Sequence, residues 1–374
     1  MRIRAAVLYE MGLPPPYANS RPLRVEDVEL DGPGSGEVLV RIREAGLCHS
    51  DLSVIDGNRP RPLPMVLGHE SAGIVEALGA GVTGFAVGDH VVTAFVPSCG
   101  HCEPCNQGRP ALCEPGFAAN SAGTLLSGAR RLHRQDRIFT HHLGGSGFAD
   151  HAVVAEQSLV RVDPELPFDQ AALFGCAIIT GVGAVLNTAQ LPRGASVAVL
   201  GLGGVGLAAL LGARMQEPRV LVAVDLNADK LALATRLGAT HAFAGDDPDL
   251  TGKIREATRG GVEFAFEMAG SAQAMQAAYA VTRRGGTTVT AGLSRPQAQF
   301  SVPHVGIVAE ERTIKGSYLG GCQPRRDIPR YIEWFQAGRL PVDLLLSERI
   351  GLDDVNPAFD RLASGRTVRQ VILI

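Results

Sequence analysis

The chain of 374 residues has no surplus of basic residues, because its 35 lysines and arginines are matched by 38 aspartates and glutamates, which leaves a net charge of −3. A nucleic-acid-binding protein normally shows a basic excess or a basic stripe, so we expect no nucleic-acid partner. Charged residues make up only 20% of the chain and aromatic residues 5%, whereas hydrophobic residues reach 45%. That balance excludes a mostly disordered protein, and the length suits two domains.

The first residues show no pattern typical of a secretory signal, and MRIRAAVLYE (1–10) has the apolar alternation of a strand. Two stretches without charge, 170–192 and 194–213, are long enough to be mistaken for membrane spans. Polar residues and a proline interrupt the first stretch, and the glycines at 201, 203, 204 and 206 interrupt the second. We therefore interpret both as buried elements of a soluble, cytoplasmic protein with no membrane partner.

Four of the seven cysteines lie within fifteen residues of one another, and they are Cys99, Cys102, Cys105 and Cys113. In a chain without an export signal, such a cluster indicates metal binding rather than disulfides. Four thiolates can surround a tetrahedral Zn²⁺, and a site with four protein ligands leaves no position for a substrate. We expect a structural zinc here, in a lobe at about 97–115.

The pattern of hydrophobic residues changes along the chain. Up to about 162, short strand-like runs such as EVLVRIR (37–43) and HVVT (90–93) alternate with turn residues and predict a β-rich first domain. From about 169 to 320, apolar strands such as SVAVL (196–200) alternate with helical segments such as 228–237. This α/β alternation predicts a parallel, doubly wound sheet.

Gly201, Gly203 and Gly206 form a G-x-G-x-x-G motif between a predicted strand and a predicted helix. In that context the first glycine permits a tight turn, the second leaves room for a pyrophosphate, and the third lets helix and strand pack closely. Asp225 ends the next predicted strand, about twenty residues on, where an acid hydrogen-bonds the adenosine ribose. Because a carboxylate repels a 2′-phosphate, the predicted cofactor is NAD rather than NADP.

Cys48, His69 and Cys176 offer two thiolates and an imidazole, which is the ligand set of a zinc that keeps its fourth position open. Taken singly, a buried cysteine is commonly just a small hydrophobic residue. The three residues indicate a catalytic metal because the same chain carries the four-cysteine cluster and the dinucleotide motif. A zinc with an open position can take up an alcohol and lower its pKa, as it lowers that of water.

Six features carry a resemblance to a known family, and they are CHSD (48–51), GHE (68–70), the four-cysteine lobe, GC (175–176), the glycine motif with Asp225, and GRTVR (365–369). In these features the chain resembles the zinc-dependent alcohol dehydrogenases of the medium-chain dehydrogenase/reductase superfamily, nearly from end to end. The resemblance implies a GroES-like catalytic domain at 1–177 and 320–374, and a Rossmann NAD-binding domain at 178–319 with the active-site cleft between them. It also implies NAD, two zinc ions per chain, and a homodimer, with a tetramer as the alternative.

The resemblance further implies roles for single residues. Ser50 would hydrogen-bond the alcohol, and Glu70 would stand behind the zinc as an outer or transient ligand. Contacts to the cofactor would come from His49 and Arg369 at the pyrophosphate, Lys230 at the adenosine ribose, and Thr180 and Gly292 at the nicotinamide. The substrate pocket would be lined by Phe95, Ala118, His142, Leu143, Leu293 and Tyr318, which suits a medium-sized or aromatic primary alcohol.

The chain departs from its relatives at several positions. Ser53 stands where many relatives have a histidine that completes a proton relay, so the cofactor ribose, His49 or water could take its place. The glutathione-dependent formaldehyde dehydrogenases have an acid and an arginine at the positions of Arg59 and Phe117, which argues against a glutathione adduct as substrate. The segment 115–142 nevertheless has the length seen in that branch, and we interpret its basic part, 128–142, as a solvated loop.

We expect an NAD-linked enzyme that interconverts a primary alcohol and its aldehyde. The alternatives are an S-(hydroxymethyl)glutathione-type formaldehyde dehydrogenase, a non-catalytic nucleotide-binding Rossmann protein, and a zinc-free quinone or enoyl reductase of the same superfamily. The complete set of zinc ligands together with Ser50 argues against the binding protein. The four-cysteine lobe argues against the zinc-free reductase.

Overall fold

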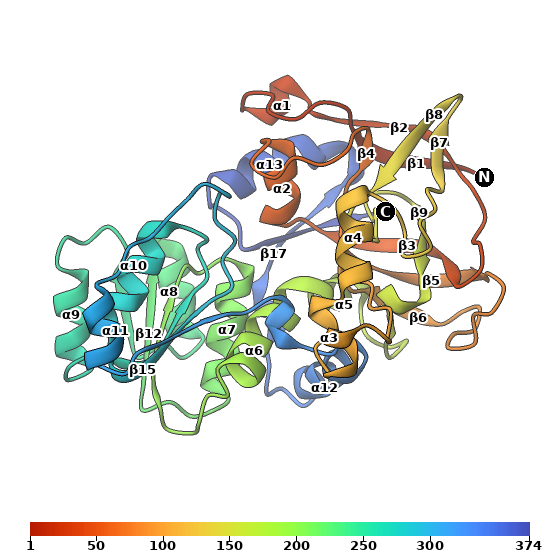
Figure 1. Cartoon of the computed structure of the whole chain (residues 1–374). Coiled ribbons are helices and arrows are strands. Elements are labelled where there is room, and N and C mark those ends of the chain that lie inside the picture. Colours follow the sequence, from red (N-terminus) through yellow and green to blue (C-terminus); the bar gives the residue numbers. More distant parts are fainter. The chain divides into compact units, whose positions relative to one another are not determined.

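A computed structural model describes residues 1–374, and the chain divides into two compact units (Figure 1). The first unit comprises Met1–Cys176, Gln323–Glu333 and Leu346–Ile374, and the second comprises Ala177–Cys322 and Trp334–Leu345. The segment Trp334–Leu345 therefore belongs to the second unit, although the sequence places it within the catalytic domain. The apolar pattern of a sequence predicts that a segment is buried, but it does not indicate against which unit the segment packs.

Five strands of the first unit close into a barrel in the order β1–β2–β7–β8–β4. Their bounds are Arg2–Leu8, Leu23–Leu30, Leu132–Arg134, Arg137–His141 and Met65–Val66. Alternate residues of β1 point into the barrel, where Ile3, Ala5 and Val7 pack with Phe139. The N-terminal alternation predicted as a strand thus forms one wall of this core.

The basic stretch 128–142 is not the solvated loop predicted from its charge, because it contains the antiparallel hairpin of β7 and β8. Two of its four arginines form ion pairs with acids of the first unit. Arg131 Nε lies 2.8 Å from Glu37 Oε2, and Arg134 Nη1 lies 2.7 Å from Glu26 Oε2. A basic run can therefore belong to a barrel when acidic residues of neighbouring segments neutralise it.

A second sheet of the first unit has the order β10–β6–β5–β3–β18–β17, and β9 also pairs with β3. The bounds of these strands are Leu159–Arg161, His90–Thr93, Glu70–Leu78, Glu37–Gly46, Arg369–Leu373, Leu346–Gly351 and His151–Ala155. β18 pairs antiparallel with the end of β3, and Val371 lies opposite Gly46. The C-terminal strand therefore lies beside the residues that lead into Cys48.

The second unit contains a six-stranded sheet in the order β13–β12–β11–β14–β15–β16, and every pairing in it is parallel. The strands are His241–Ala244, Val220–Asp225, Ser196–Leu200, Val262–Glu267, Thr282–Thr290 and Thr313–Gly316. Its helices include α7 (Gly204–Arg214), α8 (Ala228–Arg236), α9 (Leu250–Ala257), α10 (Ala272–Val281) and α11 (His304–Ala309). The predicted fold class, a GroES-like β-rich domain with a Rossmann-type domain, is confirmed.

The remaining helices have nine residues or fewer, apart from α12 with thirteen. They are α1 (Tyr17–Ser20), α2 (His49–Ile55), α3 (Glu103–Asn106), α4 (Glu114–Ala122), α5 (Phe168–Leu173), α6 (Ile179–Gly183), α12 (Pro324–Gln336) and α13 (Val355–Ala363). The helical stretch Phe168–Thr188 is long and apolar enough to cross a membrane, but 83% of its most apolar window is buried inside the structure. Such burial is typical of a core helix, so this stretch is weak evidence for a membrane span.

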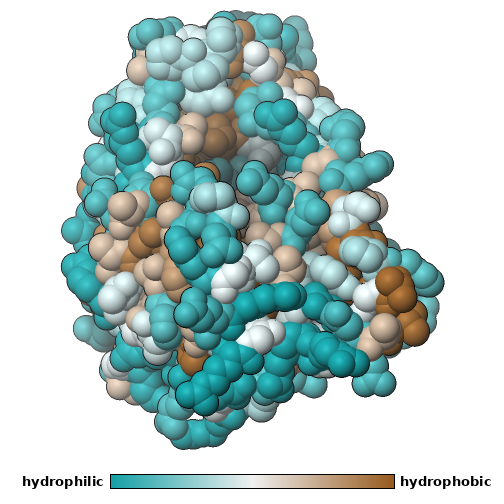
Figure 2. All heavy atoms as spheres, turned by 90° about the vertical axis from the view of Figure 1, so that its left-hand side faces the viewer, coloured by the Kyte–Doolittle hydropathy of each residue, from teal (hydrophilic) through white to brown (hydrophobic).

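Figure 2 shows the surface from the side on which α9 and α11 lie in Figure 1. This surface is mostly hydrophilic, and its hydrophobic atoms form small separate groups. The second unit has exposed hydrophobic side chains at Val305 and Val308 of α11, with 71% and 67% of their surface accessible. All four residues of β16, the strand at the edge of the parallel sheet, are exposed as well.

Candidate active site

Cys48 lies between the end of β3 and the start of α2, where it caps the helix. Its backbone N–H donates to Asp51 Oδ2 at 3.1 Å, and Asp51 is the third residue of the helix. A helix start leaves backbone N–H groups without partners, and an acid at this position satisfies one of them. The CHSD motif therefore holds the backbone of Cys48 in place by local interactions alone.

Four buried side chains of the first unit form one cluster: Cys48, His69, Glu70 and Cys176 have ligand atoms within 4.8 Å of one another. Glu70 is the first residue of β5, where it pairs with Gly46 of β3, and His69 directly precedes it. Cys176 lies in a π-helical turn, Phe174–Ile178, a geometry often found at functional sites. The three ligands predicted from the sequence thus come together, although they are far apart in the chain.

The polar atoms of this cluster fit a metal ion. His69 Nε2 and Glu70 Oε2 are buried without a hydrogen-bond partner. The other ring nitrogen, His69 Nδ1, lies 3.1 Å from Asp51 Oδ1, so the proton belongs on Nδ1 and Nε2 is left as a ligand atom. A buried polar atom without a partner costs roughly 1–3 kcal/mol. Two thiols and one free imidazole nitrogen suit zinc, which would satisfy that atom.

The charges in the cluster favour a cation. A hydrogen bond from Cys176 lowers the pKa of Cys48, and the same bond together with burial raises the pKa of Cys176. Burial alone would lower the pKa of His69, but the negative charges of Asp51 and Cys48 outweigh it and raise that pKa well above its ordinary value. In the absence of metal, the cluster therefore holds protons that a zinc ion would displace.

Glu70 and Arg369 form a buried pair next to the cluster. Arg369 Nη1 donates to Glu70 Oε1 at 2.9 Å and to the carbonyl oxygen of Leu47 at 3.0 Å. Burial raises the pKa of Glu70 to about 8, and Cys48 adds to the rise while Arg369 opposes it. In the structure, the Arg369 side chain therefore pairs with Glu70. The contact of Arg369 with the cofactor pyrophosphate stays a prediction.

The predicted proton-handling residues lie on α2. Ser50 is half-buried and His49 is exposed, both in the first turn. Ser53 Oγ donates to the carbonyl oxygen of His49 at 2.7 Å, so its hydroxyl proton is used within the helix. With its proton used in this way, Ser53 does not replace the histidine that completes the proton relay in many relatives. The outward route of the proton stays a prediction.

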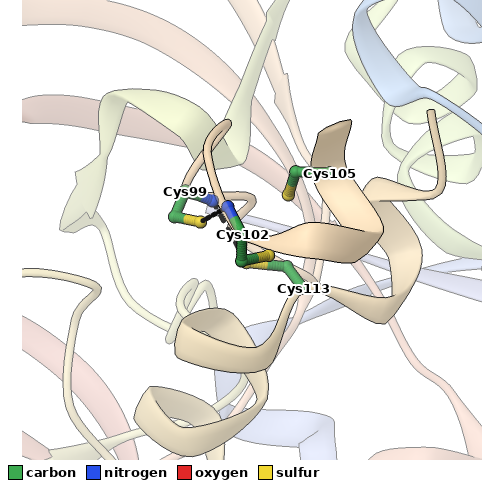
Figure 3. A group of neighbouring side chains, drawn as sticks. All are labelled: Cys99, Cys102, Cys105 and Cys113. Carbon is green, nitrogen blue, oxygen red and sulfur yellow. Dashed lines mark hydrogen bonds between the residues drawn. The ribbon is translucent and has the colours of Figure 1, made fainter. Parts of the chain in front are cut away.

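The four clustered cysteines turn their sulfur atoms toward a common centre (Figure 3). Cys99 N–H donates to Cys113 Sγ at 3.1 Å, and Cys102 N–H donates to Cys99 Sγ at 3.3 Å. A hydrogen bond from the backbone of Cys105 lowers the pKa of Cys102 to about 6, whereas burial raises that of Cys105 to about 12. The geometry fits a closed four-thiolate metal site, in which zinc would replace the remaining protons.

The glycine motif of the second unit separates into one open and two crowded positions. A β-carbon on Gly201 would lie 2.5 Å from the amide nitrogen of Ala269, and one on Gly206 would lie 1.7 Å from the carbonyl oxygen of Gly201. A β-carbon on Gly203 would have no atom within 4 Å. The space at Gly203 fits a pyrophosphate at the start of α7, where free N–H groups favour negative charge.

The strand-terminal acid lies against this motif. Asp225 Oδ2 accepts a hydrogen bond from Leu202 N–H at 2.6 Å, and Oδ1 accepts one from Asn227 N–H at 2.9 Å. Lys230 is half-buried in the first turn of α8. These contacts hold the Asp225 carboxylate beside the glycine turn, as expected for a group that binds a ribose.

The other predicted cofactor and pocket residues divide between the units. Thr180 is buried in α6 with its hydroxyl unpartnered, and a β-carbon on Gly292 would lie 2.2 Å from the Gly270 nitrogen. In the first unit lie Phe95, Ala118, His142 and Leu143, and in the second lie Leu293 and Tyr318. Of the first-unit set, only Ala118 is exposed.

Asp51 is a functional candidate to which the sequence reading assigns no role. Its carboxylate contacts both the backbone of Cys48 and the imidazole of His69. The signal was present, because an acid three residues after a helix cap is typical of a capping box. Its second contact, with His69, depends on the pairing of β3 with β5, and no short sequence pattern predicts that contact.

Comparison with known proteins agrees with this geometry. Residues 34–164 match the alcohol dehydrogenase GroES-like domain, and residues 204–337 match the zinc-binding dehydrogenase domain. The chain is 39% identical over 377 residues to a Mycobacterium tuberculosis protein named "Putative alcohol dehydrogenase D", covering 100% of both chains. It is 35% identical over 384 residues to the S-(hydroxymethyl)glutathione dehydrogenase of Paracoccus denitrificans, again covering 100% of both.

A solved structure extends the likeness to three dimensions. The benzyl alcohol dehydrogenase of Acinetobacter calcoaceticus superimposes with a TM-score of 0.93 at 33% identity, over 100% of this chain and 99% of that chain. Both the sequence matches and this superposition cover the two units and the residues that form the metal cluster. The chain therefore belongs to the zinc-dependent alcohol dehydrogenases of the medium-chain dehydrogenase/reductase superfamily, and it is an oxidoreductase.

Proposed function

We propose that this protein interconverts a primary alcohol, medium-sized and aliphatic or aromatic, with its aldehyde by hydride transfer with NAD. The observation that carries the proposal is the buried cluster of Cys48, His69 and Cys176, in which His69 Nε2 has no hydrogen-bond partner within the protein. A non-catalytic nucleotide-binding protein would have no use for a metal site with an open position.

The chain would hold each participant with its own residues. Zinc supplies a Lewis acid that lowers the pKa of an alcohol, and NAD⁺ supplies the hydride acceptor. Cys48, His69 and Cys176 would hold the metal, while Asp51 fixes the protonated nitrogen of His69. Ser50, half-buried on the same helix as Cys48, would accept the proton of the substrate hydroxyl and pass it outward.

The preference for NAD rests on Asp225, whose carboxylate is held beside the glycine turn by two backbone amides. A 2′-phosphate would bring a second negative charge to this carboxylate. Gly203 supplies the open space for the pyrophosphate, and Lys230, Thr180 and Gly292 complete the proposed contacts. We propose NAD on these grounds, and two zinc ions per chain on the two separate clusters.

A glutathione-dependent formaldehyde dehydrogenase is the second candidate, because two curated relatives, 35% and 36% identical, are named S-(hydroxymethyl)glutathione dehydrogenase. That branch has an acid and an arginine where this chain has Arg59 and Phe117. Phe117 is 69% exposed on α4, so the chain presents an apolar ring in place of a cation. The reversal of charge at Arg59 and the loss of a cation at Phe117 favour an uncharged alcohol over a glutathione adduct.

For the quaternary structure we propose a cytoplasmic homodimer that forms through the second unit. β16 is an edge strand with all four residues exposed, and an exposed edge is a template for pairing with another strand. The exposed valines of α11 follow β15 and precede β16 along the chain. Light scattering of the wild type and of an Ile314→Pro variant tests this: a dimer that becomes a folded monomer supports it, and a dimer in both contradicts it.

The substrate proposal is tested by following the absorbance of reduced nicotinamide. Benzyl alcohol and hexanol with NAD⁺ are compared with formaldehyde plus glutathione at the same enzyme concentration. Turnover of the plain alcohols, with no gain from glutathione, supports the proposal. Turnover only of the glutathione adduct would instead assign the chain to the second candidate.

A further inference from the structure

His142 follows β8 in the first unit and lies against the side of the proposed zinc site. Its Nδ1 is 3.1 Å from Asp51 Oδ1, and both side chains are buried, with 1% and 0% of their surface accessible. Its ring is edge-on to the ring of His69, with 5.5 Å between centroids and 87° between planes. Thus His142, assigned above only to the lining of the pocket, contacts the group that orients a predicted zinc ligand.

Asp51 is the meeting point of these contacts. Oδ2 accepts from the N–H of Cys48 at 3.1 Å, while Oδ1 is approached by Gly68 N–H at 3.3 Å, His69 Nδ1 at 3.1 Å and His142 Nδ1 at 3.1 Å. A single carboxylate therefore touches two proposed ligands, the backbone of one and the side chain of the other. Any shift of Oδ1 changes the direction in which His69 Nε2 points.

His69 has three neighbours that fix its ring. Asp51 holds Nδ1, and Phe95 and His142 each meet the ring edge-on, with centroid distances of 5.7 and 5.5 Å. Phe95 can act only through its shape. His142 can act through its shape and through Nδ1, a buried atom whose one short polar contact, with Asp51, is poorly aligned for a full hydrogen bond.

We propose that His142 is a positioning residue for the catalytic zinc: its Nδ1–H restrains the Asp51 oxygen that holds His69, and thereby orients the imidazole toward the metal. The inference rests on the proposed zinc site of Cys48, His69 and Cys176. Partners that orient a metal-binding histidine typically contribute about 10–100-fold to metal affinity. Asp51 is such a partner of His69, and His142 acts on His69 indirectly, through its contact with Asp51.

Three substitutions separate the donor from the shape. His142→Phe keeps a planar ring and removes the donor. His142→Asn places an amide nitrogen near the position of Nδ1, and His142→Gln places it near the position of Nε2. Because Nδ1 is the atom that faces Asp51, only the asparagine variant should replace the lost contact.

The experiment measures how fast zinc leaves each purified holoenzyme for a colorimetric chelator. We expect the faster-leaving, catalytic zinc to dissociate about 10–100-fold faster in His142→Phe and His142→Gln than in the wild type, and within about threefold in His142→Asn. The zinc of the four-cysteine cluster should leave at an unchanged rate in all variants, which shows that the first unit is still folded. Equal rates in wild type and His142→Phe, or equal losses in the asparagine and glutamine variants, would overturn the proposal.

Cobalt substitution adds a readout independent of activity. A Co²⁺ ion at this site would show d–d absorption bands that respond to the geometry of its ligands, so His142→Phe should shift those bands and His142→Asn should not. Unshifted bands in His142→Phe would contradict a positioning role. A wild type that holds zinc only at the four cysteines would refute the proposed function itself, which keeps the two failures apart.

Discussion

Arg369, in the last strand of the chain, donates from Nη1 to Glu70 Oε1 at 2.9 Å, with both side chains almost entirely buried. The two residues are 299 positions apart, and the pairing of β18 with β3 brings them together. The pair lies beside the proposed zinc ligands, so the C-terminal strand supports the site as well as the sheet.

Breaking this pair should be costly, because it leaves one buried ionisable group without its partner. The pKa of Glu70 is about 8 and Arg369 opposes its rise, so without Arg369 the buried carboxyl is protonated at pH 7. We therefore expect Arg369→Leu to lower the stability of the metal-free protein by about 1–3 kcal/mol at pH 7, the cost of a buried polar group without a partner. Adding Glu70→Gln should recover part of the loss above pH 8, since glutamine stays neutral there. Thermal unfolding of the two single variants and the double variant measures the coupling, and strictly additive losses would show that the pair contributes no specific interaction.

Two glycines of the motif allow an effect on folding to be compared with an effect on cofactor binding. Gly206→Ala would place a β-carbon 1.7 Å from the carbonyl oxygen of Gly201, whereas Gly203→Ala would place one in open space. We expect Gly206→Ala to lower the unfolding temperature strongly. Gly203→Ala should unfold like the wild type but bind NADH at least about 10-fold more weakly, because its methyl group would occupy the pyrophosphate site. Calorimetric titration with NADH measures the second effect, and unchanged affinity in a folded Gly203→Ala protein would refute the assigned role.

Asp225 should set the choice of cofactor. Asp225→Ser removes the charge that would repel a 2′-phosphate and the acceptor for the ribose hydroxyls. We therefore expect kcat/KM for NAD⁺ to fall by about 10-fold or more and kcat/KM for NADP⁺ to rise, with a loss of about 1–3 kcal/mol in binding NAD⁺. Steady-state kinetics with both cofactors checks the prediction, and an unchanged ratio would count against the role of Asp225.

Glu44 should make stability fall as pH rises. Burial, with the nearby charge of Asp169, raises its pKa to about 7, although Arg349 and Arg43 oppose the shift. The folded protein then binds a proton that the unfolded chain releases, so stability is full below about pH 4.5 and declines until about pH 7. Glu44→Gln removes the charge, and at pH 8 it should raise the unfolding temperature by roughly 2–4 °C, with no gain at pH 5. An equal gain at both pH values would exclude titration as the cause.

Local patterns predicted much of the fold, and they singled out the residues that the structure gathers into two candidate metal clusters. The strand at 196–200 and the helical segment at 228–237 have short-range signatures, and the structure has them as Ser196–Leu200 and Ala228–Arg236. What the sequence did not predict depends on distant pairing. The hairpin at 128–142 looked like a charged loop because its acidic partners, Glu37 and Glu26, lie about a hundred residues away.

The same distinction holds within the site. Cys48 and Asp51 are linked by a local helix cap, and the three-residue spacing between them is enough to predict such a cap. The contact between Asp51 and His142 joins α2 to the segment after β8, and no spacing in the sequence indicates it. The π-helical turn that carries Cys176 could not be predicted either, because its apolar sequence has the same pattern as an ordinary α-helix.

The most direct test of the account is metal content and turnover measured together on the wild type and on Cys48→Ser, with Cys113→Ser as the matched control. We expect two zinc ions per wild-type chain and one in each variant. Cys48→Ser should still bind NADH but reduce NAD⁺ with benzyl alcohol at least 1,000-fold more slowly than the wild type, an effect of about 4 kcal/mol or more on the transition state. Full activity in a Cys48→Ser protein that has lost one zinc would contradict the account.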